Sequence, residues 1–192
     1  MIKWFDDLRV GMRFKSPDML VTREDIKRFA AEFDPQPYHL DEAAAERSQL
    51  KGLAASGWHT AAMAMRLAVE THPFGPHPLL GLGVDELRWL APVRPGDIIH
   101  LEGEVVEVTP SRTRPQGTVR VKWTAFNQDG AAVLYVYANW RRPTPTTGQL
   151  ICRASKQAGR CLAERAQTRC RCGRGLQSQA LVRAARFLTA RG

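Results

Sequence analysis

Apolar residues recur every three or four positions in the first third of the chain, which is the period of a helix with one buried face. They are Ile26, Phe29, Ala30 and Phe33. Thr22 stands where the N-cap of this helix belongs. Pro35 and Pro37 end the helix, because proline lacks an N–H donor and disfavours helical geometry in the residue before it. Asp41 is expected to cap a short second helix over residues 42 to about 49.

The segment over residues 58–70 is apolar on almost every side. It holds one charged residue, Arg66, before its last position, and a stretch of small residues ending in Gly57 leads into it. A helix of this composition has no polar face to turn toward water. The pattern therefore predicts a central helix that is buried.

From residue 80 the pattern changes to the two-residue alternation of strands. Segments rich in β-branched and aromatic residues span 80–90, 98–108, 118–127 and 133–140, and one or two further strands are expected between residues 13 and 21. The turns between them are short, which favours antiparallel neighbours because parallel strands need long crossovers. The sequence therefore predicts an α+β fold, with an antiparallel sheet of five or six strands wrapped round a central buried helix.

The net charge of +9 arises in the C-terminal part of the chain. Residues 1–142 carry 18 basic and 18 acidic side chains, whereas residues 143–192 carry ten basic ones against the single acid Glu164. All four cysteines lie in this tail, and a linker rich in Pro and Thr precedes them. We expect one domain over residues 1–142 and a basic tail over 143–192 that is flexible or partly helical and dispensable for folding. The positive charge of the tail favours nonspecific attraction to acidic surfaces or nucleic acid over specific recognition of nucleic acid.

Neither a membrane segment nor a metal site is indicated by the sequence. No apolar run approaches the roughly 18 residues of a membrane span, and the first residues lack the apolar stretch of a signal peptide, so a soluble cytoplasmic protein is expected. His72 and His77 lack a third ligand, and Cys170 and Cys172 lack CxxC spacing, so no metal is expected. His59, on the apolar helix, is expected to be a core histidine with satisfied hydrogen bonds.

The most unusual segment carries an aspartate and a histidine five residues apart, Asp34 and His39, on a turn stiffened by two prolines. Prolines restrict the chain, so the two side chains have a narrow range of separations. A carboxylate and an imidazole that contact one water can activate it and return its proton. The alternative from composition alone is structural, with Asp34 capping backbone amides and His39 lying at the surface.

The run from Asp34 to His39 resembles the hydratase motif of the MaoC-like dehydratases, the (R)-specific enoyl-CoA hydratase branch of the hot-dog fold. The motif usually reads Gly-Asp-x-Asn-Pro-Leu/Ile-His followed by an aspartate, and this chain keeps the Asp, the second Pro, the His and Asp41. Gly57 resembles the family's glycine at the start of its central helix, and residues 88–97 resemble the strand and turn that follow it. The resemblance covers about residues 10–142.

The resemblance implies hydration or dehydration of an α,β-unsaturated acyl thioester, with Asp34 and His39 as the catalytic pair that holds the water. It also implies that the N–H of Gly57 meets the negative charge developing on the thioester oxygen. The other candidates for substrate or oxyanion contacts are Ser56, Gln36 and Tyr38. No metal or redox cofactor is implied, and coenzyme A enters as part of the substrate.

Four departures from the family's pattern bear on the substrate. Phe33 replaces the glycine and Gln36 replaces the asparagine, so the mouth of the site is expected to be narrower and differently hydrogen-bonded. Ser56 stands where the hydratases usually have a histidine. A polar residue that some hydratases carry further along the central helix is absent from residues 61–65.

Two other functions stay open from the sequence. One is a hot-dog acyl-CoA thioesterase, which attacks the thioester carbonyl, and the other is a non-catalytic subunit that binds acyl thioesters. The acyl group is expected on coenzyme A or on a carrier protein, with Arg88, Arg94 and Arg120 as candidates for binding the phosphates. A sheet wrapped round one helix leaves an edge strand unpaired, so a homodimer or a higher homo-oligomer is expected.

Overall fold

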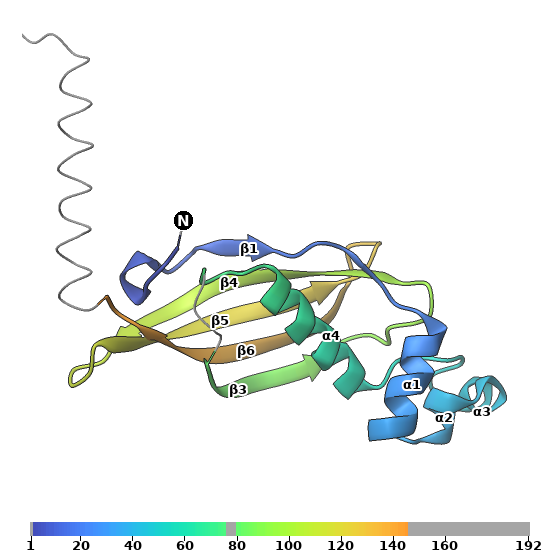
Figure 1. The fold of residues 1–192 in the computed structure, drawn as a ribbon. Coiled ribbons are helices and arrows are strands. Elements are labelled where there is room, and N and C mark those ends of the chain that lie inside the picture. The colour runs from blue at the N-terminus through green and yellow to red at the C-terminus, as the bar shows by residue number, and fades with distance from the viewer. Residues whose placement is uncertain (1, 76–79, 146–192) are drawn as a thin grey trace, which may run out of the picture. The chain divides into compact units, whose positions relative to one another are not determined.

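The computed structural model describes residues 2–75 and 80–145 of the chain. Its main element is an antiparallel sheet in the order β1-β4-β5-β6-β3, with β2 also paired to β4 (Figure 1). The strands are β1 (Arg13–Lys15), β2 (Met19–Leu20), β3 (Leu80–Trp89), β4 (Ile98–Pro110), β5 (Gln116–Phe126) and β6 (Ala132–Pro143). The prediction of an antiparallel sheet of five or six strands is confirmed, and two short strands lie between residues 13 and 21.

The helices are a 3-10 turn η1 (Phe5–Asp7), α1 (Arg23–Phe33), α2 (Pro37–Leu40), α3 (Glu42–Arg47) and α4 (Gly57–Glu70). Both caps that the sequence predicts are present, because the Thr22 side chain accepts the N–H of Asp25 and Asp41 accepts that of Ala44. The turn expected at the two prolines contains a one-turn helix, α2, which begins at Pro37. Proline is tolerated there because the first residue of a helix needs no N–H donor.

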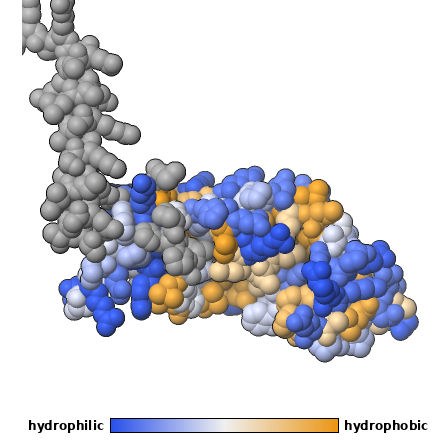
Figure 2. All heavy atoms as spheres, in the orientation of Figure 1, coloured by the Kyte–Doolittle hydropathy of each residue, from blue (hydrophilic) through white to orange (hydrophobic). Residues whose placement is uncertain are grey.

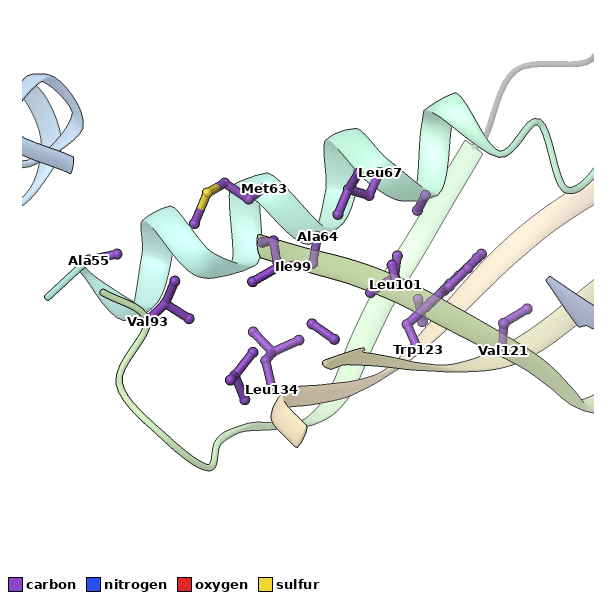
Figure 3. Packing of buried hydrophobic residues seen from close by; sticks show 14 of the residues in the cluster. Ala55, Met63, Ala64, Leu67, Val93, Ile99, Leu101, Val121, Trp123 and Leu134 are labelled. Atoms are coloured by element: carbon purple, nitrogen blue, oxygen red, sulfur yellow. The ribbon is translucent and has the colours of Figure 1, made fainter. Parts of the chain in front are cut away.

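The core lies between α4 and the sheet, where side chains of α4 face those of the strands (Figure 3). Labelled members of this cluster are Met63, Ala64 and Leu67 of α4 with Ile99, Leu101, Val121, Trp123 and Leu134 of the sheet. Burying these apolar side chains supplies the main driving force for the fold. α4 therefore lies across one face of the sheet, as Figure 1 shows.

The other face of α4 is exposed. Trp58, Met65 and Val69 are 61%, 43% and 46% exposed. The predicted central helix is buried on the side that faces the sheet. Its other side is exposed in the single chain, because the described residues provide a layer on one face of α4 only. On the face of the molecule drawn in Figure 2, hydrophobic residues reach the surface between hydrophilic ones.

Most of the basic tail lies outside the described residues, and so does His77, so the expectations for both stay predictions. The expected domain boundary lies at the end of the described chain, where β6 ends at Pro143. Within the described residues, no helix has both the length and the apolar character that crossing a membrane requires.

Candidate active site

Three separate segments supply the residues that the sequence analysis singled out. Asp34 is the C-cap of α1, His39 lies in α2, and Ser56 is the N-cap of α4, directly before Gly57. Figure 1 shows α1, α2 and α3 grouped beside one end of α4. The backbone N–H of Ala55 donates to the carbonyl of Val93 at 2.8 Å, which fixes the loop before α4 against the loop after β3.

His39 is buried, with 5% of its surface exposed. Its Nδ1 lies 2.7 Å from the carbonyl oxygen of Ala54. A carbonyl can only accept a hydrogen bond, so Nδ1 carries the hydrogen, and Nε2 of the neutral ring is left with a free lone pair. Nε2 lies 3.6 Å from Oδ2 of Asp34. The alternative that His39 is a surface residue is therefore wrong.

The Asp34 carboxylate accepts hydrogen bonds from two side chains. Ser56 Oγ donates to Oδ2 at 2.5 Å, and Gln36 Nε2 donates to Oδ1 at 2.7 Å. These two bonds, the one from Ser56 foremost, lower the pKa of Asp34 below its usual 3.8, and His39 acts in the same direction against the effect of burial. Asp34 is therefore an ionised carboxylate held in one orientation beside the imidazole.

Gly57 is the first residue of α4 and lies under the indole of Trp89. Trp89 Nε1 donates to the carbonyl oxygen of Gly57 at 2.7 Å. A Cβ atom at position 57 would lie 2.7 Å from Cε2 of this indole, closer than carbon atoms can approach. Only glycine therefore fits under Trp89, a residue that sequence reasoning did not single out.

A cavity of about 370 Å³ opens beside the start of α4. Its walls include His39, Tyr38 and Gly57, and its apolar walls include Leu50, Leu90 and Val93. Asp34 and Ser56 do not line the cavity. Asp34 lies beside His39, which does line it, and Ser56 directly precedes Gly57, which also lines it. Mostly apolar walls with a few convergent polar groups are typical of a small-molecule site.

The remaining polar candidates have partners of their own. The hydroxyl of Tyr38 donates to Oε1 of Gln36, so these two side chains form one chain of hydrogen bonds that ends at Asp34. This arrangement places Gln36 beside the Asp34 carboxylate, whereas Tyr38 lines the cavity.

The three arginines considered for phosphate binding have different partners in the protein. Arg94 Nη2 donates to the carbonyl of Leu50 at 2.7 Å, and Arg88 Nη1 donates to the carbonyl of Leu87 at 3.1 Å. Arg120 lies over the ring of Tyr137 and pairs with acidic residues of β3, 3.5 Å from Asp85. Within residues 2–75 and 80–145, no group of three or more His, Cys, Asp or Glu side chains is arranged to hold a metal ion.

His59 differs from the core histidine with satisfied hydrogen bonds that the sequence predicts. It is 8% exposed, and its ring stacks on Phe29 with the centroids 4.7 Å apart. Its Nδ1 is buried without a hydrogen-bond partner among the described residues. The pKa of His59 is lowered, mainly by burial. The charge of Asp25 raises this pKa, and the charge of Arg28 lowers it. His59 is therefore a core histidine, but its hydrogen bonds are not all satisfied within the described residues.

Comparison with known proteins identifies the family. The sequence model of the MaoC like domain matches residues 7–126, more than half of the chain. The chain belongs to the MaoC-like dehydratase family. The uncharacterized protein YdeM of Bacillus subtilis is 33% identical over 123 residues, which cover 64% of this chain and 86% of YdeM. Mesaconyl-CoA hydratase of Cereibacter sphaeroides is 41% identical over 59 residues, 31% of this chain and 17% of that enzyme.

Solved structures of MaoC-like dehydratases share the fold. The MaoC-like dehydratase from Rhodospirillum rubrum has a TM-score of 0.70 and 44% identity, covering 74% of this chain and 98% of that one. The R-hydratase PhaJ1 from Pseudomonas aeruginosa has a TM-score of 0.60 and 30% identity, covering 74% of this chain and 86% of that one. The sheet with its central helix is therefore a hot-dog fold, as the sequence predicts, and the neighbours indicate a hydratase or dehydratase in general.

The structure shows where two of the residues that depart from the MaoC-like motif lie and what they contact. Phe33 is 65% exposed and packs on Phe29, with ring centroids 5.1 Å apart. It does not line the cavity, so the expectation that it narrows the mouth is not met. Ser56 is fully buried, and its hydroxyl donates its hydrogen to Asp34, a contact between distant segments that no local sequence pattern indicates.

Proposed function

We propose that this MaoC-like protein adds water to an α,β-unsaturated acyl thioester, or removes it, in the cavity beside the start of α4. One observation carries the proposal. Nε2 of His39 lies 3.6 Å from Oδ2 of Asp34, while Nδ1 is already bound to the carbonyl of Ala54. A buried lone pair and an ionised carboxylate at this separation can both contact one water molecule and move its protons.

Hydration forms one C–O bond, at Cβ of the substrate, and transfers one proton to Cα. In hydration, the water oxygen bonds to Cβ of the substrate while one of its protons passes to the Asp34–His39 pair. The electrons of the double bond move toward the thioester carbonyl, and the resulting enolate takes a proton from the pair at Cα. Dehydration runs the same steps in reverse. Proton transfer suffices for this chemistry, so we propose no cofactor beyond the coenzyme A or carrier that bears the acyl group.

The negative charge on the thioester oxygen needs a hydrogen-bond donor. The N–H of Gly57 belongs to the first turn of α4, where helix geometry provides no intrahelical acceptor. The positive end of the helix dipole lies at the same place. Gly57 also lines the cavity, so its N–H is the group that we propose to stabilise the enolate.

Incubation with crotonyl-CoA and with a longer enoyl-CoA tests the proposed reaction. Hydration is expected to remove the absorbance of the conjugated thioester without releasing free thiol, and Asp34→Asn is expected to stop this loss. Release of free thiol would instead identify a thioesterase. Binding of either compound with no change in absorbance or thiol would identify a non-catalytic subunit, and loss of absorbance that persists in Asp34→Asn would overturn the site assignment.

We also propose that two copies of the chain associate through the exposed apolar surface around β3. β3 is the last strand in the sheet order, and its Leu82 and Val84 are 45% and 61% exposed. Trp58 of α4 and Trp89 of β3 add exposed aromatic surface, with their ring centroids 5.5 Å apart. An edge strand beside so much apolar surface favours pairing. Light scattering of the full chain is expected to give at least twice the mass of one chain, and a monomer at micromolar concentration would contradict the proposal.

A further inference from the structure

We infer that Ser56 is a positioning residue that holds the Asp34 carboxylate in place and couples it to the first turn of α4. The inference rests on the proposed function, because it assigns a task to Ser56 within the same site. Ser56 has 0% exposure and lies at the N-cap of α4. Its hydroxyl is therefore a buried polar group whose bonds are all made to protein atoms.

The direction of each bond to Ser56 is fixed by its partner. Its Oγ lies 2.5 Å from Oδ2 of Asp34 and 3.2 Å from the backbone nitrogen of Trp58. The N–H of Trp58 can only donate, so Ser56 Oγ accepts there and gives its single hydrogen to the carboxylate. A bond to an ionised acceptor is among the stronger hydrogen bonds in proteins.

The Ser56 hydroxyl thereby connects the Asp34 carboxylate to the start of α4. Asp34 ends α1, and Gly57 begins α4 next to Ser56. The bond between Ser56 and Asp34 spans 22 residues of sequence. It fixes the carboxylate relative to the N–H of Gly57, and therefore fixes the proton-transfer group relative to the donor for the thioester oxygen. Small displacements of such groups reduce rates strongly.

The arrangement also argues against Ser56 as a nucleophile. In a serine hydrolase the histidine lies between the serine and the acid and takes the serine's proton. Here both Ser56 Oγ and His39 Nε2 face Oδ2 of Asp34, so the carboxylate lies between them. Among the described residues, no hydrogen bond joins Ser56 to His39, and the hydroxyl hydrogen goes to the Asp34 carboxylate, a weak base whose pKa is lowered further by this bond.

Gln36 provides an internal comparison, because it binds the other oxygen of the same carboxylate. Its side chain donates to Oδ1 of Asp34 at 2.7 Å from an exposed position. Water can replace an exposed donor, whereas nothing replaces a buried one. Gln36→Ala is therefore expected to change turnover less than the loss of the Ser56 hydroxyl.

The test uses Ser56→Gly, Ser56→Ala and Ser56→Thr in the full chain. Glycine is tolerated at an N-cap and alanine is not, so the first two variants remove the same bond to Asp34 but differ in helix capping. Ser16→Ala is the matched control: its hydroxyl is also buried and accepts a backbone N–H, from Leu101 at 2.8 Å, but it lies outside the site.

Both Ser56→Gly and Ser56→Ala are expected to lower kcat/KM for the enoyl-CoA by about 10- to 100-fold, the usual range for losing a hydrogen bond to a charged group. The acid limb of their pH–rate profile is expected to move to higher pH, because Asp34 then binds a proton more readily beside Gln36 and His39. Ser56→Thr is expected to restore both properties, and Ser16→Ala to lower the melting temperature without moving the profile. An unchanged pH profile in Ser56→Gly would overturn the inference, as would equal rate losses in Ser56→Gly and Ser16→Ala.

A carboxyl ¹³C NMR titration of Asp34, assigned with Asp34→Asn, separates this inference from the proposed reaction. If the protein hydrates no enoyl-CoA but Asp34 titrates at higher pH in Ser56→Gly, the proposed function fails and the coupling stands. If hydration is normal in Ser56→Gly and Asp34 titrates as in the unaltered protein, the coupling fails and the proposed function stands.

Discussion

Two histidines are buried near the start of α4, and their surroundings differ. His39 is 5% exposed and His59 is 8% exposed. Both ring nitrogens of His39 face oxygen atoms, one from the carbonyl of Ala54 and one from Asp34. The ring of His59 lies flat on Phe29, and its Nδ1 has no partner in the described chain.

The difference shows that partners, and not burial, decide what a buried histidine can do. The carbonyl of Ala54 fixes one tautomer of His39 and leaves a basic nitrogen beside a carboxylate. His59 has apolar contact instead, and burial lowers its pKa so that it resists protonation. We therefore expect His39 to move protons and His59 to pack.

The largest expected effect is on turnover. Asp34→Asn and His39→Gln are each expected to lower the hydration rate by about 10²- to 10⁴-fold. The double variant is expected to be hardly slower than either single one, because members of one catalytic unit are non-additive. Steady-state kinetics with an enoyl-CoA measures all three variants.

His59→Phe is the matched control for this prediction, since it alters the other buried histidine. It is expected to retain turnover within a few-fold, because it removes no group from the proposed reaction path. A loss in His59→Phe as large as in His39→Gln would contradict the comparison. So would multiplicative losses in the double variant of Asp34 and His39.

The next largest effect concerns Gly57, the first residue of α4. Gly57→Ala places a methyl group 2.7 Å from the indole of Trp89, which is held by its bond to the Gly57 carbonyl and by the ring of Trp58. Overpacking of this kind lowers stability by about 1–3 kcal/mol. Thermal or urea unfolding measures the change.

A second substitution locates the cause of that loss. Adding Trp89→Leu to Gly57→Ala is expected to recover part of the lost stability, because the smaller side chain makes room for the methyl group. If Gly57→Ala unfolds like the unaltered protein, the close contact with Trp89 does not constrain this position.

The smallest expected effect is a dependence of stability on pH. The pKa of His59 is lower in the folded protein than its ordinary 6.5, so the unfolded chain binds this proton more readily. Stability is therefore expected to fall as pH drops through about 6.5, the ordinary histidine value. Asp34 has a lowered pKa as well, but its contribution is lost only near and below 3.8, so the two windows are separate.

Urea unfolding between pH 8 and pH 5 measures the contribution of His59. His59→Phe is expected to flatten the curve over this range, and Asp25→Asn to steepen it because the charge of Asp25 raises the pKa of His59. An unchanged slope in His59→Phe would show that this histidine is not the group responsible.

Local features of the fold could be predicted from the sequence because they depend on residues a few positions apart. The caps Thr22 and Asp41 act on backbone groups three residues away. The strands are predicted by the alternation of apolar and polar residues and by the short turns between them. The closeness of Asp34 and His39 is predicted by their spacing on a short turn. The one-turn helix at Pro37 was missed, because a single turn has too few positions to show a period.

Contacts between segments could not be predicted from local patterns. The bond from Trp89 to Gly57 spans 32 residues, and the bond from His39 to Ala54 spans 15. The exposed face of α4 is another such case, since its composition is nearly uniform and only the position of the sheet decides which side is covered.

Local patterns along the chain predict the longer helices and the strands in their order, the antiparallel sheet, and a carboxylate and an imidazole close together on one turn. Contacts between distant segments bring Ser56 to Asp34 and Trp89 to Gly57, and they give His39 and His59 different partners. The physical reason is the range of the interactions. Periodicity and capping act within a turn or two of the chain. Each of these partners is instead brought into place by tertiary packing, of α1 against α2 and α4, and of α4 against the sheet.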